Sequence, residues 1–171
     1  MPEYKVTLAR TNDLPLLPAI ELAAEKLFAG HGLDSIPSVT TSLEDFKEAQ
    51  EKGHLWVALA GNTPVGFGLV KVLEIMMAHL EEIDVHPAHG RRGLGTRLVM
   101  EICNWATSAG YRSVTLTTFR EIPWNMPFYA RLGFEEIPSY ELSPALLAVI
   151  KDETNRGLDP ALRVTMRWTV K

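Results

Sequence analysis

The feature that most constrains this chain is a turn rich in glycine and arginine at residues 83–96. It reads Ile-Asp-Val-His-Pro-Ala-His-Gly-Arg-Arg-Gly-Leu-Gly-Thr. A strand is predicted before it, at 78–85, and an amphipathic helix after it, at 95–108. In this order, the glycines and the helix N-terminus direct backbone N–H groups toward an anion. Arg91, Arg92 and Arg97 add donors suited to phosphate.

Several kinds of phosphate-binding turn share this outline. Gly90 and Gly95 have the outer spacing of a P-loop, but Thr96 and Arg97 stand where Lys and Ser or Thr are required. A dinucleotide fingerprint would need a third glycine after Gly95 and an acidic residue closing the next strand, and neither is present. Both nucleotide sites are therefore disfavoured, and an ordinary tight turn stays open beside an anion site.

The length of 171 residues predicts one domain, spanning 1–171. The formal charge of −4 disfavours a dedicated nucleic-acid binder. No apolar run approaches the ~20 residues of a membrane span, and the N-terminus has no signal-peptide pattern. The only cysteine, Cys103, is expected to be an inert core thiol, and no metal site is expected because the histidines show no paired ligand motif. A cytoplasmic protein is therefore expected.

Hydrophobic periodicity and turn residues predict alternating strands and helices in one α/β fold. Strands are expected at 4–10, 54–60, 64–73, 78–85, 113–118, from 134, and at 161–170. The first helix is expected to be capped by Thr11 or Asn12 and to bury Leu16, Ile20, Leu22, Ala23 and Leu27. Further helices are expected at 42–53, 95–108, 125–132 and 144–154, and a loop at 30–41.

A second motif follows the glycine turn after one helix and one strand. It reads Phe128-Tyr129-Ala130-Arg131-Leu132-Gly133-Phe134. Together with Val85-x-Pro87 and Arg91-Arg92-Gly93-Leu94-Gly95, it resembles the GNAT superfamily of N-acetyltransferases, most closely over 79–136. The resemblance implies a mixed, mostly antiparallel twisted sheet of about six to seven strands flanked by about four to five helices.

The resemblance also implies transfer of an acetyl group from acetyl-CoA to a primary amine of a small molecule or peptide. One departure is Gly90, which stands where the family usually has Gln or Arg, so that Arg91, Arg92 or the backbone alone would bind the phosphates. Backbone pairing of residues 83–85 with the pantetheine arm is expected. The coenzyme-binding residues expected on this basis are Ile83, Asp84, Val85, Gly90, Arg91, Arg92, Gly93, Leu94, Gly95, Thr96 and Asn125. For Asn125 an N-cap role is the simpler alternative.

Acetyl transfer to an amine requires two proton transfers. An alkylamine with a pKa near ~10.4 must lose a proton before it can attack. The departing thiolate leaves more easily when an acid protonates it. The resemblance implies that Tyr129 is this acid, and the alternative is that Tyr129 is an aromatic residue of the core. Alternation puts His79, Glu81, Ile83 and Val85 on one face of the strand. The resemblance implies that Glu81, or His79, is the base, because the family usually has acidic or histidine residues at these positions. The alternative is that both are ordinary polar residues on a solvated sheet face, and a bulge would promote Glu82 or Asp84.

Other interpretations remain open. One is a non-catalytic GNAT-like sensor of acyl-CoA or an amine, and another is transfer of longer acyl groups or acylation of a hydroxyl. The acceptor is expected to contact the loops at 30–41, 119–125 and 140–160. A homodimer through residues 161–168 is plausible, since relatives commonly pair through late strands.

Overall fold

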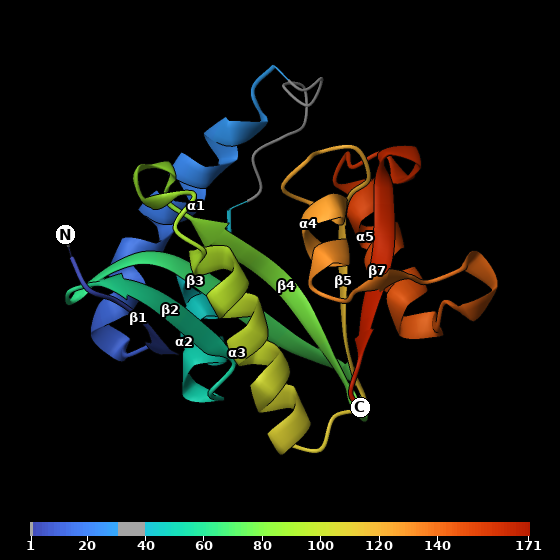
Figure 1. The fold of residues 1–171 in the computed structure, drawn as a ribbon. Coiled ribbons are helices and arrows are strands. Elements are labelled where there is room, and N and C mark those ends of the chain that lie inside the picture. The colour runs from blue at the N-terminus through green and yellow to red at the C-terminus, as the bar shows by residue number, and fades with distance from the viewer. Residues whose placement is uncertain (1, 31–39) are drawn as a thin grey trace. The chain divides into compact units, whose positions relative to one another are not determined.

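Seven strands form one sheet in the order β1-β2-β3-β4-β5-β7-β6 in the computed structural model, which describes residues 2–30 and 40–171 (Figure 1). The pairings β1–β2, β2–β3, β5–β7 and β6–β7 are antiparallel, and β4–β5 is parallel. The mixed, mostly antiparallel sheet is therefore confirmed. The strands are β1 (Tyr4–Leu8), β2 (Leu55–Ala60), β3 (Thr63–Glu74), β4 (Met77–Val85), β5 (Ser113–Phe119), β6 (Glu135–Glu136) and β7 (Arg163–Thr169).

Five α-helices accompany the sheet among the described residues. They are α1 (Leu17–Glu25), α2 (Leu43–Glu51), α3 (Leu94–Ser108), α4 (Met126–Arg131) and α5 (Pro144–Asn155). As its capping sequence predicts, α2 begins with Ser42 Oγ accepting a 3.0 Å hydrogen bond from the Asp45 amide. Gly53, with φ of 73°, ends that segment.

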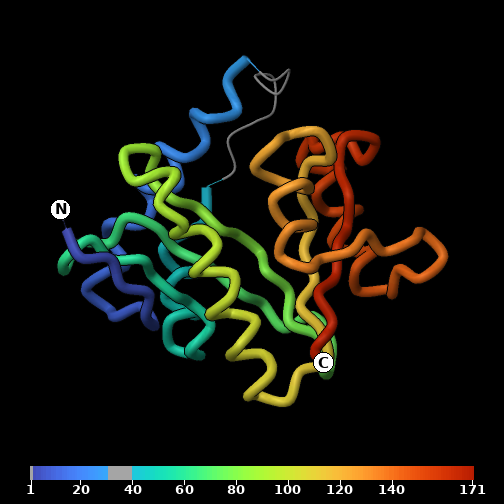
Figure 2. The backbone as a smooth tube through the Cα atoms, viewed as in Figure 1, coloured from blue at the N-terminus to red at the C-terminus, as the bar shows by residue number. Residues whose placement is uncertain are grey.

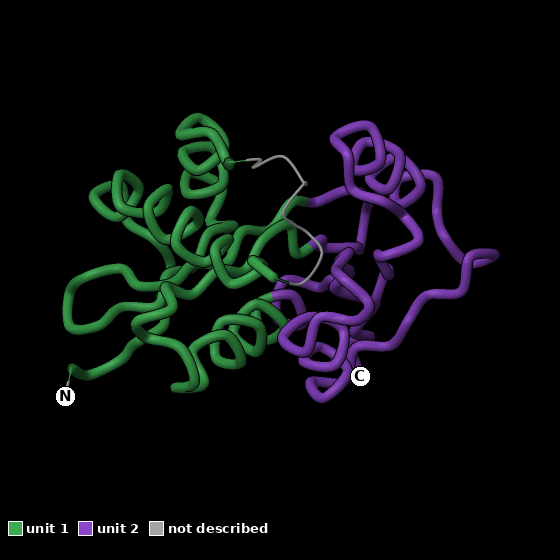
Figure 3. The backbone as a smooth tube through the Cα atoms, turned by 90° about the horizontal axis from the view of Figure 1, so that it is seen from above, with its two compact units in different colours: residues 1–34, 38–71, 80–105 green, residues 35–37, 72–79, 106–171 purple. Residues whose placement is uncertain are grey.

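The described chain divides into two compact units (Figure 3). Unit 1 contains residues 2–30, 40–71 and 80–105, and unit 2 contains 72–79 and 106–171. Each unit has its own cluster of buried apolar side chains.

Unit 1 is layered around its strands. Phe67 and Leu69 of β3 belong to the core formed with α1 and α2, where Phe46 meets Phe67 edge to face at 5.2 Å. Gly68, between them, faces the other side, where an added Cβ would lie 2.8 Å from Ile102 of α3. Strand alternation therefore places α1 and α2 against one face and α3 against the other.

In unit 2, β5 is the most extensively paired strand. It joins β7 over seven residue pairs, from Ser113–Thr169 to Phe119–Arg163. Met77, Ile137 and Leu146 form the buried cluster, with Leu73 and Leu142 packed against it. Since Leu146 lies on α5, this cluster fixes the helix that the sequence inserts before the last strand.

The first helical segment differs from the expectation. A 3-10 helix at Thr11–Leu16 precedes α1, and its N-cap residue is Arg10, not Thr11 or Asn12. Leu16, Leu22 and Leu27 are 47%, 51% and 44% exposed. Buried positions on α1 are Leu17, Ile20, Glu21 and Ala24. The tighter 3-10 turns, with Pro15 inside, shift the phase of the buried face from that of a continuous α-helix.

Candidate functional site

The turn between β4 and α3 has an unusual backbone directly before the helix. Arg91 and Gly93 both hold positive φ, 58° and 75°. Leu94 then begins α3, and the Arg97 amide donates to the Gly93 carbonyl at 3.0 Å. The first-turn amides of a helix have no carbonyl partner within the helix, so they are available to a ligand at this end. Figure 2 traces the chain through this turn, from the green of β4 into the yellow-green of α3.

Tyr4 of β1 contacts residues in the turn and at the start of α3. Its hydroxyl lies 2.9 Å from His89 Nδ1, and its carbonyl accepts from both terminal nitrogens of Arg97 at 3.3 Å. The Arg92 guanidinium lies over the Tyr4 ring, 5.6 Å from its centre. Cation–π and hydrogen-bond contacts therefore hold two of the three arginines near the helix N-terminus. Sequence reasoning missed Tyr4, which stands 85 residues before His89.

The backbone conformation of Gly90 does not require a glycine. Its φ of −68° and ψ of 164° are ordinary extended values. A residue with a side chain can adopt these angles, and the positive φ values of the turn fall on Arg91 and Gly93.

The ladder between β4 and β5 is short. It joins Met77, Ala78 and His79 to Ser113, Val114 and Thr115, and residues 80–85 lie beyond it. The backbone of Ile83, Asp84 and Val85 is therefore outside that ladder. This is the stretch for which pairing with an extended ligand is expected.

The two expected bases have different surroundings. His79 is 2% exposed, and its Nδ1 lies 2.9 Å from Thr115 Oγ1 of β5. Glu81 is exposed, with its carboxylate 3.8 Å from Lys71 Nζ of β3. The alternative that His79 is an ordinary polar residue on a solvated sheet face is wrong, because its side chain is buried and hydrogen-bonded.

Glu82 and Asp84 turn toward α1, whereas Ile83 between them turns toward α3. An added Cβ at Gly68 would meet both Ile83 and Ile102. Single oxygens of Glu21, Glu82 and Asp84 all lie within 4.8 Å of one another; we call these three residues the acidic cluster. Burial is the main cause that raises the pKa of Asp84 to about 7 and the pKa of Glu82 well above its usual range.

Sequence reasoning missed Glu21 and its partner Thr41. Glu21 is 4% exposed on α1. It accepts hydrogen bonds from the Thr41 amide at 2.7 Å and from the Thr41 hydroxyl at 2.6 Å. The available signal was a glutamate at a position with the helical spacing of Leu17 and Ile20, which predicts a buried charge that needs partners.

Tyr129 lies on α4, in unit 2. Its ring meets those of Phe128 and Phe134 at 5.0 and 5.7 Å. Its carbonyl accepts from the Phe134 and Leu132 amides at 3.1 and 3.0 Å, which ties the tyrosine to the glycine turn at Gly133. The second motif therefore forms a compact local unit around the aromatic ring.

Asn125 stands at the N-cap position of α4, but its side chain does not cap the helix. Its Oδ1 accepts from the Thr118 hydroxyl at 2.6 Å and from the Phe119 amide at 3.3 Å. The N-cap interpretation is therefore wrong. The buried side chain instead holds the end of β5, since that strand has donors there to satisfy.

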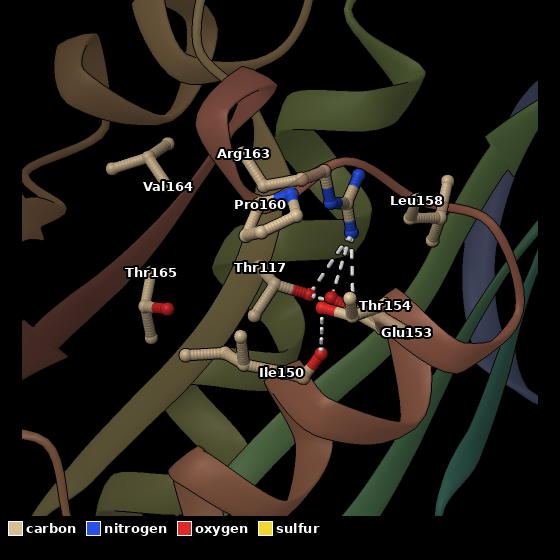
Figure 4. Close-up of a pocket in the computed structure, with 9 residues that line it drawn as sticks. All are labelled: Thr117, Ile150, Glu153, Thr154, Leu158, Pro160, Arg163, Val164 and Thr165. Carbon is tan, nitrogen blue, oxygen red and sulfur yellow. Dashed lines mark hydrogen bonds and ion pairs between the residues drawn. The ribbon is translucent and has the colours of Figure 1, made fainter.

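A small cavity of about 50 Å³ lies against α5 in unit 2 (Figure 4). At its wall, one terminal nitrogen of Arg163 is 3.2 Å from both oxygens of Glu153 and donates to Thr117 Oγ1 at 3.0 Å. The Thr117 hydroxyl donates to Glu153 at 2.6 Å. These contacts connect α5 to β5 and β7, whereas the Nε atom of Arg163 is buried without a hydrogen-bond partner.

Cys103 is buried, and burial raises the pKa of its thiol to about 12, which confirms an inert core thiol. Of the loop expected at 30–41, residues 31–39 lie outside the described residues. None of the described helices is long and apolar enough to cross a membrane.

Comparisons with known proteins agree on one family. The family model described as Acetyltransferase (GNAT) family matches residues 20–134. The glucosamine 6-phosphate N-acetyltransferase of Trypanosoma brucei brucei is 23% identical over 133 residues, which cover 71% of this chain and 88% of that protein.

Two solved structures share the fold. Rv2747 from Mycobacterium tuberculosis, in complex with CoA and NLQ, has a TM-score of 0.68 at 21% identity, covering 98% of this chain and 99% of that one. The PaiA N-acetyltransferase from Thermoplasma acidophilum, in complex with coenzyme A, has a TM-score of 0.71 at 15% identity, covering 98% and 99%.

Proposed function

We propose, from the premise that this chain belongs to the GNAT family of acetyltransferases, that it transfers the acetyl group of acetyl-CoA to a primary amine. The acceptor is an amine of a small molecule or peptide, and the transfer is a direct attack without an acyl-enzyme. The one buried thiol, Cys103, has its pKa raised to about 12, so it is a poor nucleophile.

The observation that carries the proposal is the backbone of the turn before α3. Positive φ at Arg91 and Gly93 precedes the helix, which fits a pyrophosphate held by amides of residues 91–96. Arg91 is exposed at the turn, and Arg92 and Arg97 are held beside it by Tyr4. Acetyl-CoA would supply the activated thioester when it binds. The same neighbourhood would lead its pantetheine arm along the backbone of Ile83–Val85.

Tyr129 is proposed as the acid that protonates the leaving thiolate. A phenol with a pKa near ~10 keeps its proton at neutral pH and can donate it as charge develops on sulfur. The rings of Phe128 and Phe134 fix the orientation of the phenol. Glu81 is proposed as the base because it is exposed to an incoming amine, with His79 as the alternative. Either group would take the proton that the ammonium must lose.

The Tyr129→Phe variant tests this role. Phenylalanine keeps the ring contacts and removes only the hydroxyl, so we expect kcat to fall at least about 100-fold while the Kd for coenzyme A changes less than about twofold. Thiol release from acetyl-CoA with a panel of amines measures turnover, and calorimetry measures binding.

Tyr111→Phe is the matched control because Tyr111 lies between α3 and β5, outside the proposed site, and loses the same atom. Unchanged turnover in Tyr129→Phe would exclude the acid role. Coenzyme A binding with no turnover on any amine would favour a sensor over an enzyme.

A further inference from the structure

Tyr4 contacts the glycine turn from a strand that is not adjacent to it in the sheet. β1 is the first strand in the sheet order, and β4, which leads into the turn, is the fourth. The ladder with β2 sets the backbone of Tyr4, opposite Ala60. Three groups of this one residue contact the turn or α3, namely the hydroxyl, the ring and the carbonyl. Because β2 fixes the backbone, the side chain can be changed while the carbonyl stays in place.

The side chain of Tyr4 restricts the segment that enters the turn. Its hydroxyl lies 2.9 Å from Nδ1 of His89, and the two rings meet edge to face with their centres 5.8 Å apart. His89 is the last residue of the 3-10 helix Pro87–His89. It stands directly before Gly90 and Arg91, and Arg91 is the first residue of the turn with positive φ. The hydrogen bond and the ring contact therefore limit the motion of the chain just before its unusual backbone conformation.

The ring and the carbonyl of Tyr4 hold two exposed arginines. The Arg92 guanidinium lies 5.6 Å from the ring centre, and both terminal nitrogens of Arg97 donate to the carbonyl at 3.3 Å. Long side chains lose rotamer freedom when a ligand orders them, and this loss weakens binding. Arginines that are ordered before the ligand arrives lose less freedom. An arginine also has more N–H donors than the Tyr4 carbonyl accepts, so Arg97 can still donate to a ligand.

We propose that Tyr4 is a positioning residue for coenzyme binding, because its hydroxyl and ring hold the glycine turn and Arg92 in place before the ligand arrives. This role rests on the proposed use of acetyl-CoA. The contacts of Tyr4 reach the turn and α3, so loss of its side chain changes the affinity for the coenzyme. The rate of acetyl transfer from bound acetyl-CoA is unchanged, since Tyr4 takes no part in the two proton transfers.

Two variants separate the groups of the Tyr4 side chain. Tyr4→Phe removes the hydroxyl and keeps the ring, whereas Tyr4→Leu removes both. In calorimetric titrations of the full chain with coenzyme A, we expect Kd to rise at least about threefold in Tyr4→Phe and at least about tenfold in Tyr4→Leu. Tyr111→Phe loses the same hydroxyl in unit 2 and is expected to change Kd less than about twofold.

A double-mutant cycle with His89→Ala tests whether the Tyr4 hydroxyl acts through His89. If it does, Tyr4→Phe raises Kd at least about threefold in the wild type but less than about 1.5-fold in the His89→Ala background. Equal rises in both backgrounds would contradict the assignment, because a general loosening of the fold would not depend on His89. Circular dichroism checks that each variant is folded. If Tyr4→Leu fails to fold, Tyr4→Phe and this cycle decide.

Steady-state kinetics distinguish positioning from a part in the reaction. With an amine that the wild type acetylates, the KM for acetyl-CoA is expected to rise with Kd in Tyr4→Phe while kcat changes less than about twofold. Tyr129→Phe is expected to show the opposite pattern. A fall in kcat with unchanged KM and Kd would overturn the positioning role. The binding measurements need no turnover.

The same titrations separate this proposal from the proposed function. Wild-type affinity for coenzyme A in both Tyr4 variants, or tighter binding in either, would overturn the positioning role and leave acetyl transfer standing. Folded wild-type protein that binds no coenzyme A would overturn the proposed function, and the positioning role with it.

Discussion

The backbone and the side chain of Asp84 contact different elements. Its carbonyl approaches β3, where an added Cβ at Gly66 would lie 3.0 Å from it. Its carboxylate turns toward Glu21 and Glu82 on the α1 side. Because the strand fixes the backbone, the carboxylate is held in the acidic cluster. The contribution of this carboxyl group to the stability of the fold therefore depends on whether it is protonated.

The raised pKa of Asp84 predicts how the free energy of unfolding changes with pH. Burial raises the pKa of Asp84 from 3.8 to about 7, so the folded chain holds this proton more tightly than the unfolded chain. The stabilisation is fully present below the unfolded pKa and is lost as the pH rises through about 7. We expect urea denaturation to show the free energy of unfolding falling between about pH 5 and about pH 8, and Asp84→Asn to reduce that fall.

Glu101→Gln serves as the control for loss of a carboxylate, since its side chain is exposed on α3. A variant Asp84→Asn that follows the wild-type pH dependence would show that this aspartate titrates normally. Lowered stability of Asp84→Asn at about pH 8 would count equally against the account.

At the scale of elements, the contact between β3 and α3 depends on a missing side chain. Gly68 leaves room for the Cδ1 atoms of Ile102 and Ile83, which would lie 2.8 and 3.0 Å from an added Cβ. Ile102 is fully buried, so it has little space into which to retreat. This close approach sets the distance between β3 and α3, the helix that follows the glycine turn.

Gly68→Ala is therefore expected to lower the free energy of unfolding by about 1–3 kcal/mol through overpacking. Combining it with Ile102→Val removes the Cδ1 that the new methyl group meets. In that background we expect the cost of Gly68→Ala to shrink by at least about half, as a double-mutant cycle in urea would measure. Equal costs in both backgrounds would place the strain elsewhere.

Elements with a strong local pattern were predictable, and contacts between distant residues were not. The β2–β3 hairpin follows from Gly61, and α3 buries Leu98, Ile102 and Ala106 as its periodicity predicts. The strand from 134 shrinks to Glu135–Glu136 because Pro138 and a 3-10 turn follow at once. In the candidate site, Glu21 and Thr41 meet across 20 residues, and Tyr4 and His89 across 85. No local pattern reports such pairs.

For the whole molecule, the family match extends over residues 20–134 and includes parts of both compact units. The glycine turn and the acidic cluster belong to unit 1, and Tyr129 belongs to unit 2. A single domain over 1–171, a homodimer and a cytoplasmic location stay predictions.

The central claim is that this chain uses acetyl-CoA, and calorimetric titration with acetyl-CoA tests it most directly, with ATP and NAD as controls. The account predicts saturable binding of one acetyl-CoA per chain and no binding of either nucleotide control. It also predicts that binding weakens as salt is added, because arginines contact the pyrophosphate. Folded protein that binds ATP or NAD but not acetyl-CoA would contradict the account.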